Sequence, residues 1–332
     1  MKQIGFALLA LGFQAMAQTP NKVLRFAHTV NEQHMNEIAT VTRAISEVKP
    51  WADAATRTMR IEGSPEQLAA AEWVFHELDR PLDAAPPSTA RVYKMPDAKN
   101  EGQVRVFHLA HSPSVQALQE LATAIRAATE VRRLFTMGDA RIIVVRGTEE
   151  QVAVADWLLQ QLDTPQKPGF SVSRERPMSD PQGEGYLRIF YPRTVTTVQQ
   201  LQEMATCTRA LAEIRRLFTY NVKNAIVVRG TAERLKLAEW LLLELDQKPR
   251  TEYAASPQYV MPDIAAEGFV KVFFAPHKKS AAELQALAVE VRTTTQVRRL
   301  FTYNTPSAIC VRGTANQIAR AEELVAATVK KN

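Results

Sequence analysis

The sequence contains few of the residues on which most enzyme and metal sites depend. Its 332 residues include two cysteines, six histidines and 12 glycines. Two cysteines cannot form a disulfide framework. None of the histidines lies in an HExxH or Cys/His metal pattern, and the sequence has no G-x-S-x-G elbow, G-x-G-x-x-G fingerprint or phosphate-binding glycine loop. We therefore predict a protein that is not an enzyme and has no cofactor, metal site or small-molecule substrate.

Long hydrophobic runs are also scarce. The longest, Ile4 to Met16, follows Lys2 and ends in the small residues of Ala15-Met16-Ala17. This pattern is typical of a secretory signal peptide and is too short to span a bilayer comfortably. We expect residues 1–17 to be removed near Ala17 and the remaining chain to be periplasmic, without a transmembrane segment. An uncleaved anchor or a buried first helix is the alternative.

A repeated stretch is the most informative feature of the sequence. Residues 131–148 read VRRLFTMGDARIIVVRGT, and closely similar stretches occupy 214–231 and 297–314. Phe135, Phe218 and Phe301 are equivalent, because 218 − 135 = 83 and 301 − 218 = 83. A fixed period of this kind indicates one structural unit copied in tandem.

Hydrophobic periodicity and helix caps predict strand–helix–strand–strand–helix for each copy. Thr148 with Gln151 forms a capping box before the last helix, whereas Arg234 breaks the box in the third copy. We predict an α+β fold: an array of four small βαββα modules, each with two helices on one face of a small sheet. The predicted ranges are 22–83 for a divergent module 1, 91–166 for module 2, 175–249 for module 3 and 258–331 for module 4. Extra edge strands are expected at 91–93 and 258–260.

Arginines are the best candidates for binding. Net charge is +6, and an arginine pair opens the second strand of three modules. These six candidate binding residues are Arg132, Arg133, Arg215, Arg216, Arg298 and Arg299. Adjacent strand residues point to opposite faces, so one of each pair faces away from the helices. Such guanidinium groups can bind carboxylates or anionic polymers. The alternative is a salt bridge within the module, for example to Glu130 or Glu213.

Three smaller observations concern the interior of the modules. Cys207 and Cys310 occupy small apolar positions, and a disulfide between them would have to cross between copies. A tryptophan of the last helix, such as Trp157, becomes Glu323 in module 4, which indicates either contact with the next module or an ordinary core position. Acidic residues at the ends of the last helices are interpreted as structural. They are Asp79, Asp163 and Asp246.

The segments Ile142–Asp163 and Ala225–Asp246 and the AICVRGTANQIARAEELV run of module 4 resemble the short periplasmic N-terminal, KH-like domain of bacterial type II and type III secretion secretins. The resemblance covers 104–331 well and module 1 weakly. It implies domains that stack in rings and contact other secretion components. No glycine-rich, alternating segment for an outer-membrane pore follows module 4 in this sequence, so we expect the periplasmic part without the pore.

Three hypotheses about function follow. The first is an exported scaffold that binds protein partners of a secretion or pilus apparatus, or assembles with itself. The second is a KH-like nucleic-acid binder, which we do not expect, because no GXXG loop joins helices and the signal peptide directs the chain away from nucleic acid. The third is a binder of anionic polymers or cell wall through the arginine rows. Paired faces and sheet edges would suit strand addition or stacking in the first case.

Overall fold

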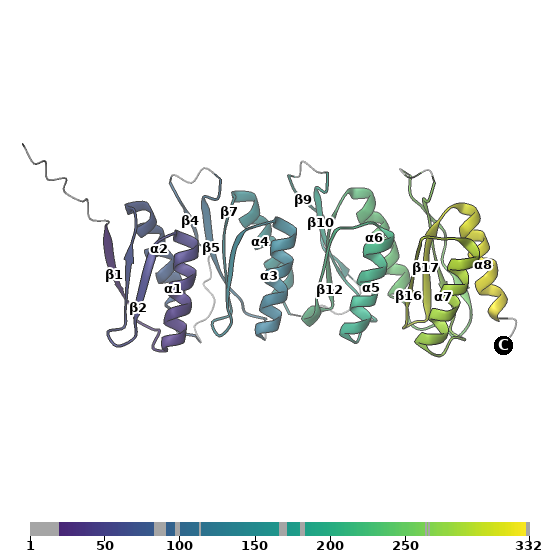
Figure 1. The fold of residues 1–332 in the computed structure, drawn as a ribbon, viewed down its shortest axis with the longest axis horizontal. Helices are drawn as coiled ribbons and strands as arrows, with labels where there is room; N and C mark the ends of the chain where they lie inside the picture. The colour runs from purple at the N-terminus through teal and green to yellow at the C-terminus, as the bar shows by residue number, and fades with distance from the viewer. Residues whose placement is uncertain are drawn as a thin grey trace, which may run out of the picture. The chain divides into compact units, whose positions relative to one another are not determined.

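The computed structural model describes residues 20–82, 91–96, 100–112, 114–165, 171–179, 183–262, 264 and 266–329. The predicted signal peptide, 1–17, lies outside these residues. The chain divides into two compact units, Met1–Pro81 and Leu82–Asn332. The first includes residues 22–81 of the predicted module 1, and the second includes the ranges predicted for modules 2, 3 and 4 (Figure 1).

Unit 1 is a small antiparallel sheet with two helices. Its elements are β1 (Asn21–Arg25), α1 (Glu32–Ser46), β2 (Lys49–Asp53), β3 (Thr58–Glu62) and α2 (Pro65–Leu78). The strand order is β1-β3-β2. Helix α2 begins with a capping box, in which Ser64 accepts from the backbone N–H of Gln67 and the Gln67 side chain accepts from that of Ser64. Met35, Ile38 and Met59 are fully buried between helix and sheet.

Unit 2 repeats this arrangement. The elements of module 2 are β4 (Val92–Lys94), β5 (Gln103–His108), α3 (Val115–Thr129), β6 (Arg133–Met137), β7 (Ile142–Gly147) and α4 (Glu149–Leu162). Those of module 3 are β8 (Ser171–Val172), β9 (Arg176–Pro177), β10 (Tyr186–Tyr191), α5 (Val198–Leu211), β11 (Arg216–Tyr220), η1 (Asn221–Lys223), β12 (Ala225–Gly230) and α6 (Ala232–Leu245). Those of module 4 are β13 (Ala254–Ala255), β14 (Tyr259–Val260), β15 (Phe269–Phe274), α7 (Ala281–Thr295), β16 (Arg299–Tyr303), β17 (Ala308–Gly313) and α8 (Ala315–Val329). The α+β prediction is confirmed.

The sheets of unit 2 share the order of their three long strands, and those of modules 3 and 4 have a fifth strand, because β9 pairs with β10 and β14 pairs with β15. Module 2 has the order β4-β5-β7-β6, and modules 3 and 4 have β11-β12-β10-β8 and β13-β15-β17-β16. The extra edge strands predicted before module 2 and module 4 are present as β4 and β14. Strands β8 and β13 contain two residues each, which is too short to leave an alternating pattern in the sequence.

The opposite edge of each sheet is protected by an arginine. Arg126 of α3 donates to the carbonyl oxygen of Leu134 in β6 at 2.6 Å. Arg209 makes the same bond to β11, and Arg292 makes it to β16. An edge strand with unpaired backbone groups invites another strand. These guanidinium groups occupy one carbonyl on each edge and so disfavour strand addition there.

The sheets of modules 3 and 4 are buried on both faces. Ile189 and Val227 of module 3 belong to the same hydrophobic cluster as α3 of module 2, and Val272 of module 4 belongs to the cluster of module 3. Helices of one module therefore cover the outer sheet face of the next, as Figure 1 shows for α3 and β12. Burial on both sides explains why strands β12 and β17 begin with an apolar run of four residues without alternation.

The recurring aspartates close the module ends. Asp79 accepts hydrogen bonds from the backbone N–H groups of Ala27 and Thr29 at 2.6 and 2.8 Å. Asp163 binds the equivalent loop in module 2, and Asp246 does so in module 3. Each carboxylate thus ties the end of the second helix to the loop after the first strand of its module. This bears out the structural interpretation of these residues.

Candidate binding site at the module junctions

The two members of each arginine pair lie in different surroundings. Arg132, Arg215 and Arg298 are exposed. Their neighbours open β6, β11 and β16, are half-buried, and in modules 3 and 4 lie on the sheet face that points away from the module's own helices. Successive strand residues point to opposite faces, so one pair supplies both an exposed and a covered guanidinium group.

The covered arginines make ion pairs. Arg216 binds Glu130, which caps the C-terminus of α3 in the preceding module, and lies 3.3 Å from Glu184 of its own module. Arg299 repeats the arrangement with Glu213 of module 3, and with Glu267 at 2.7 Å. In module 2, Arg133 Nε lies 3.6 Å from Glu101. The partners Glu130 and Glu213 are thus reached across the junctions and not within a module.

A third arginine, from the Arg-Gly-Thr run, enters each junction more deeply. Arg312 is 2% exposed and donates from Nη1 to the carbonyl oxygen of Leu211, the last residue of α5, at 2.6 Å. Its Nε donates to the carbonyl oxygen of Glu267 at 2.9 Å. Burial lowers the pKa of Arg312, although a guanidinium group remains charged in proteins. Arg229 makes the equivalent bond to the carbonyl oxygen of Ala128 in α3.

An acid–amide pair completes each junction. The backbone N–H and side-chain amide of Asn221 donate to the carboxylate of Glu120 on α3 at 2.8 and 2.6 Å. Asn304 and Glu203 make the same pair at the next junction, at 2.9 and 2.7 Å. Sequence reasoning missed these residues. The signal was present, because 203 − 120 = 83 and 304 − 221 = 83, but nothing in the sequence joins the glutamate of one module to the asparagine of the next.

The tryptophans of the second helices contact the following module. The guanidinium carbon of Arg176 in β9 lies 6.0 Å from the ring centre of Trp157 in α4. The rings of Trp240 in α6 and Tyr259 in β14 are 5.2 Å apart. The sequence left open whether these tryptophans contact the next module or occupy an ordinary core position. Trp157 and Trp240 both contact the next module.

The two cysteines meet at the junction of modules 3 and 4. Cys207 on α5 and Cys310 on β17 are both free thiols, 1% and 0% exposed, in one hydrophobic cluster. Cys207 Sγ lies 3.7 Å from the carbonyl oxygen of Thr302 on β16. A hydrogen bond with Cys207, together with burial, raises the pKa of the Cys310 thiol. Both residues therefore act as small apolar groups of the junction.

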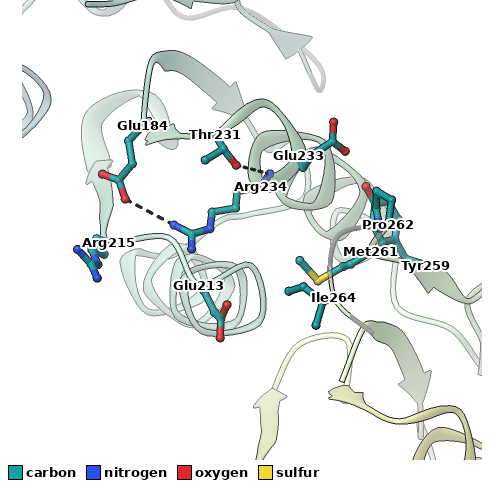
Figure 2. Close-up of a pocket in the computed structure, with 10 residues that line it drawn as sticks. All are labelled: Glu184, Glu213, Arg215, Thr231, Glu233, Arg234, Tyr259, Met261, Pro262 and Ile264. Carbon is teal, nitrogen blue, oxygen red and sulfur yellow. Dashed lines mark hydrogen bonds and ion pairs between the residues drawn. The ribbon is translucent and has the colours of Figure 1, made fainter. Parts of the chain in front are cut away.

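One pocket, of about 420 Å³, lies beside the C-terminus of α5 (Figure 2). In modules 2 and 4 a glutamine fills this place, and Gln151 donates to the carbonyl oxygen of Thr129 at 3.0 Å. Module 3 has Arg234 there, whose side chain extends to within 3.5 Å of Glu184. Arg215 borders the pocket on one side, and Met261 and Ile264 of module 4 border it on the other.

The described residues hold little else that could support chemistry. No group of three or more His, Cys, Asp or Glu side chains that could hold a metal ion occurs among them. Within the same ranges, no helix is long and apolar enough to cross a membrane. Arg132, Arg215 and Arg298 form no side-chain hydrogen bond or ion pair with any other described residue, so their donors are available at the surface.

Comparison with known proteins gives structural neighbours only. No family model matches the chain. No curated protein matches it either. The N-terminal domain of the secretin XcpQ from Pseudomonas aeruginosa is 16% identical, with 48% of this chain and 70% of that chain covered and a TM-score of 0.20. ExeD from Aeromonas hydrophila is 11% identical, with 68% and 40% covered and a TM-score of 0.16.

A protein of unknown function from Aeropyrum pernix is 14% identical, with 46% of this chain and 86% of that chain covered and a TM-score of 0.26. Secretin N-terminal domains are thus among the structural neighbours, and this chain spans less than half of ExeD. At such identities and TM-scores the similarity carries neither activity nor partners to this chain.

Proposed function

We propose that this chain is an exported, non-enzymatic scaffold of secretin-like N-domain modules that contacts protein partners of a secretion or pilus apparatus. The observation that carries the proposal is that the recurring charged residues join consecutive modules. Arg216, Arg229 and Glu130 lock module 3 onto module 2, and their equivalents lock module 4 onto module 3. Arg229 and Arg312 are buried at these two junctions, and buried polar groups that are hydrogen-bonded across a contact favour one arrangement of the parts they join. The recurring charged residues thus hold consecutive modules together.

The proposed contact surface is the set of exposed arginines, Arg132, Arg215 and Arg298. The junctions hold them at equivalent positions of successive modules, one per module, with free donors. An arginine side chain binds a carboxylate through two parallel hydrogen bonds, which gives direction as well as attraction. A partner with acidic groups repeated along an extended surface would match such a row.

The test is photo-crosslinking in the cells that produce the protein. A photoreactive residue is placed at Arg132, Arg215 or Arg298 in separate variants, with Arg320, exposed on α8, as the matched control. We expect the same protein adduct from the three positions and none from Arg320. A set of adducts identical to that of the control, or no protein adduct at the three positions, would contradict the proposal.

A second candidate function is the binding of an anionic polymer or cell wall. The same exposed row supports it, because a polyanion needs only accessible cationic groups and no matched protein surface. Retention on an anionic matrix should then fall with salt and vanish when Arg132, Arg215 and Arg298 are changed together to alanine. Retention unchanged in that triple variant would exclude this function.

A further inference from the structure

Two surfaces of the chain are exposed although their equivalents inside unit 2 are covered. At each junction of unit 2, the first helix of one module lies against the outer sheet face of the next. The outer sheet face of module 1 and the outer face of α7 in module 4 belong to these same two kinds of surface. At equivalent positions these two surfaces carry different residues from the covered surfaces. The changes on one surface complement the changes on the other.

The outer sheet face of module 1 is centred on Arg60. Arg60 lies between Met59 and Ile61, which are fully buried against the helices, so its side chain points away from them. Val23 of β1 and Trp51 of β2 are its neighbours across the sheet. Val23 is 60% exposed and Trp51 56% exposed. The row Val23–Arg60–Trp51 therefore forms an accessible surface with one cation between two apolar groups.

Strand register identifies the residues that replace this row in module 3. Arg60 pairs with Val23 and Trp51, just as Val227 pairs with Ile189 and Phe218. Arg60 thus occupies the place of Val227, which packs with α3 of module 2. Module 4 has Cys310 at this place, which meets Cys207 of α5.

The outer face of α7 is changed at the matching place. The residue equivalent to Ala124 of α3 and Cys207 of α5 is Glu290, because 207 − 124 = 83 and 290 − 207 = 83. Ala124 and Cys207 are buried at their junctions, whereas Glu290 is exposed and forms no ion pair with another described residue. Module 4 therefore has an acid, Glu290, at the position where module 3 has Cys207, the residue that meets Cys310.

We propose that copies of this chain associate head to tail, with the α7 face of one copy seated on the outer sheet face of module 1 of another copy and Glu290 paired with Arg60. Inside unit 2 the two positions carry apolar partners, Ala124 with Val227 and Cys207 with Cys310. On the two exposed surfaces both members have changed together, to opposite charges. The association uses a geometry that the chain already contains twice.

A second matched position changes in the same reciprocal manner. The acid–amide pair Glu203 with Asn304 joins modules 3 and 4. Its helix member becomes Ala286 on α7, and its sheet member becomes Ala54, the residue after β2 as Asn304 is the residue after β16. Ala286 and Ala54 can face each other without leaving a polar group unpaired. A glutamate retained on α7 would have no amide partner opposite Ala54. Solubility alone favours polar residues on exposed module faces, but it does not require that the changes on two such faces match.

The contact is heterologous, because it joins two different surfaces, and it can extend into a ring or an open filament. It goes beyond the proposed function, since a scaffold can bind other proteins whether or not its own copies join. The central ion pair is exposed, and Arg60 also lies 2.9 Å from Glu62 within module 1. We therefore expect an association that is weak and sensitive to salt.

The test is sedimentation velocity of the purified full chain at increasing concentration. At low salt the mean sedimentation coefficient should rise with concentration, and high salt should return it to the monomer value. R60E and E290R should each remain monomeric at all concentrations, because each places like charges opposite one another. The matched control E323R, exposed on α8, should associate as the unchanged chain does.

Mixing makes the test specific for the pair. An equimolar mixture of R60E and E290R should associate although neither variant does so alone, because the acid introduced in one faces the base introduced in the other. The double variant R60E/E290R should also associate. A single monomeric species of the unchanged chain at all concentrations, association of both single variants, or a mixture that stays monomeric would each overturn the proposal. None of these outcomes bears on crosslinking at Arg132, Arg215 and Arg298.

Discussion

Arg312 of β17 and Leu211 of α5 are joined by a hydrogen bond of 2.6 Å across the junction of modules 3 and 4. The guanidinium group lies against the C-terminal end of a helix, where the helix dipole favours a positive charge. The same side chain donates to the carbonyl oxygen of Glu267 in its own module. One buried cation therefore satisfies acceptors of two modules at once.

Changing Arg312 to alanine should loosen this junction. The substitution leaves a helix-end carbonyl without its donor and removes one of the cations beside Glu213. Leaving buried hydrogen-bond acceptors without their donor costs about 1 to 3 kcal/mol. Urea unfolding followed by circular dichroism should show this loss, and hydrogen exchange should increase at the end of α5. The matched variant R298A, exposed in the same module, should stay within about 0.5 kcal/mol of the unchanged chain. Equal stability of the two variants would contradict this role of Arg312.

Labelling of the two thiols should report on opening of the same junction. Cys207 and Cys310 are buried together, and the hydrogen bond with Cys207, together with burial, raises the pKa of the Cys310 thiol, so Cys310 carries little reactive thiolate at neutral pH. We expect slow modification by a thiol reagent in the native chain and faster modification in R312A. Mass spectrometry counts the labels with time. Rapid native labelling of Cys310 would show that the junction is not closed.

The fold could be predicted because its signals are local. The capping box of Thr148 and Gln151 and the apolar run of β7 are each read within a few residues of the sequence. Repetition at a fixed interval then extends each local signal to the other modules.

The junctions could not be predicted because their signals are not local. The arginine pair was recognised as recurrent, but Arg216 and its partner Glu130 are 86 residues apart. The sequence offered ion pairs within a module and binding of an outside partner as alternatives. The structure adds an arrangement that joins consecutive modules, which depends on how a sheet lies on the preceding helices. Periodicity reveals that a residue recurs and does not reveal what it faces.

Replacing Arg234 by glutamine should restore the capping box of module 3. In modules 2 and 4 the glutamine side chain accepts from the backbone N–H of the capping threonine and donates to the end of the first helix. Thr231 already accepts from the backbone N–H of residue 234, so the gain is the reciprocal hydrogen bond, about 0.5 to 1.5 kcal/mol, and Glu184 keeps its pair with Arg216. The midpoint of urea unfolding should therefore rise in R234Q. The reverse change in module 2, Q151R, should lower it, and a decrease in both variants would contradict the argument.

The carboxylate of Asp79 should give unit 1 a stability that depends on pH. Burial raises the pKa of this group, but hydrogen bonds from the backbone of Ala27 and Thr29 outweigh burial, so the pKa lies below its ordinary value. A group whose pKa is lowered by folding contributes its full stability above the unfolded pKa, near 3.9, and loses it as the pH falls through the folded pKa. D79N should therefore be destabilised at pH 7, by about 1 to 3 kcal/mol for the lost charged acceptor. The difference from the unchanged chain should begin to shrink below about pH 4, where the unfolded carboxyl takes up a proton, and should be lost as the pH falls through the lower pKa of the folded carboxyl. Hydrogen exchange of residues 20–78 at both pH values measures it, and a difference that stays constant with pH would show that the charge of Asp79 does not stabilise the fold.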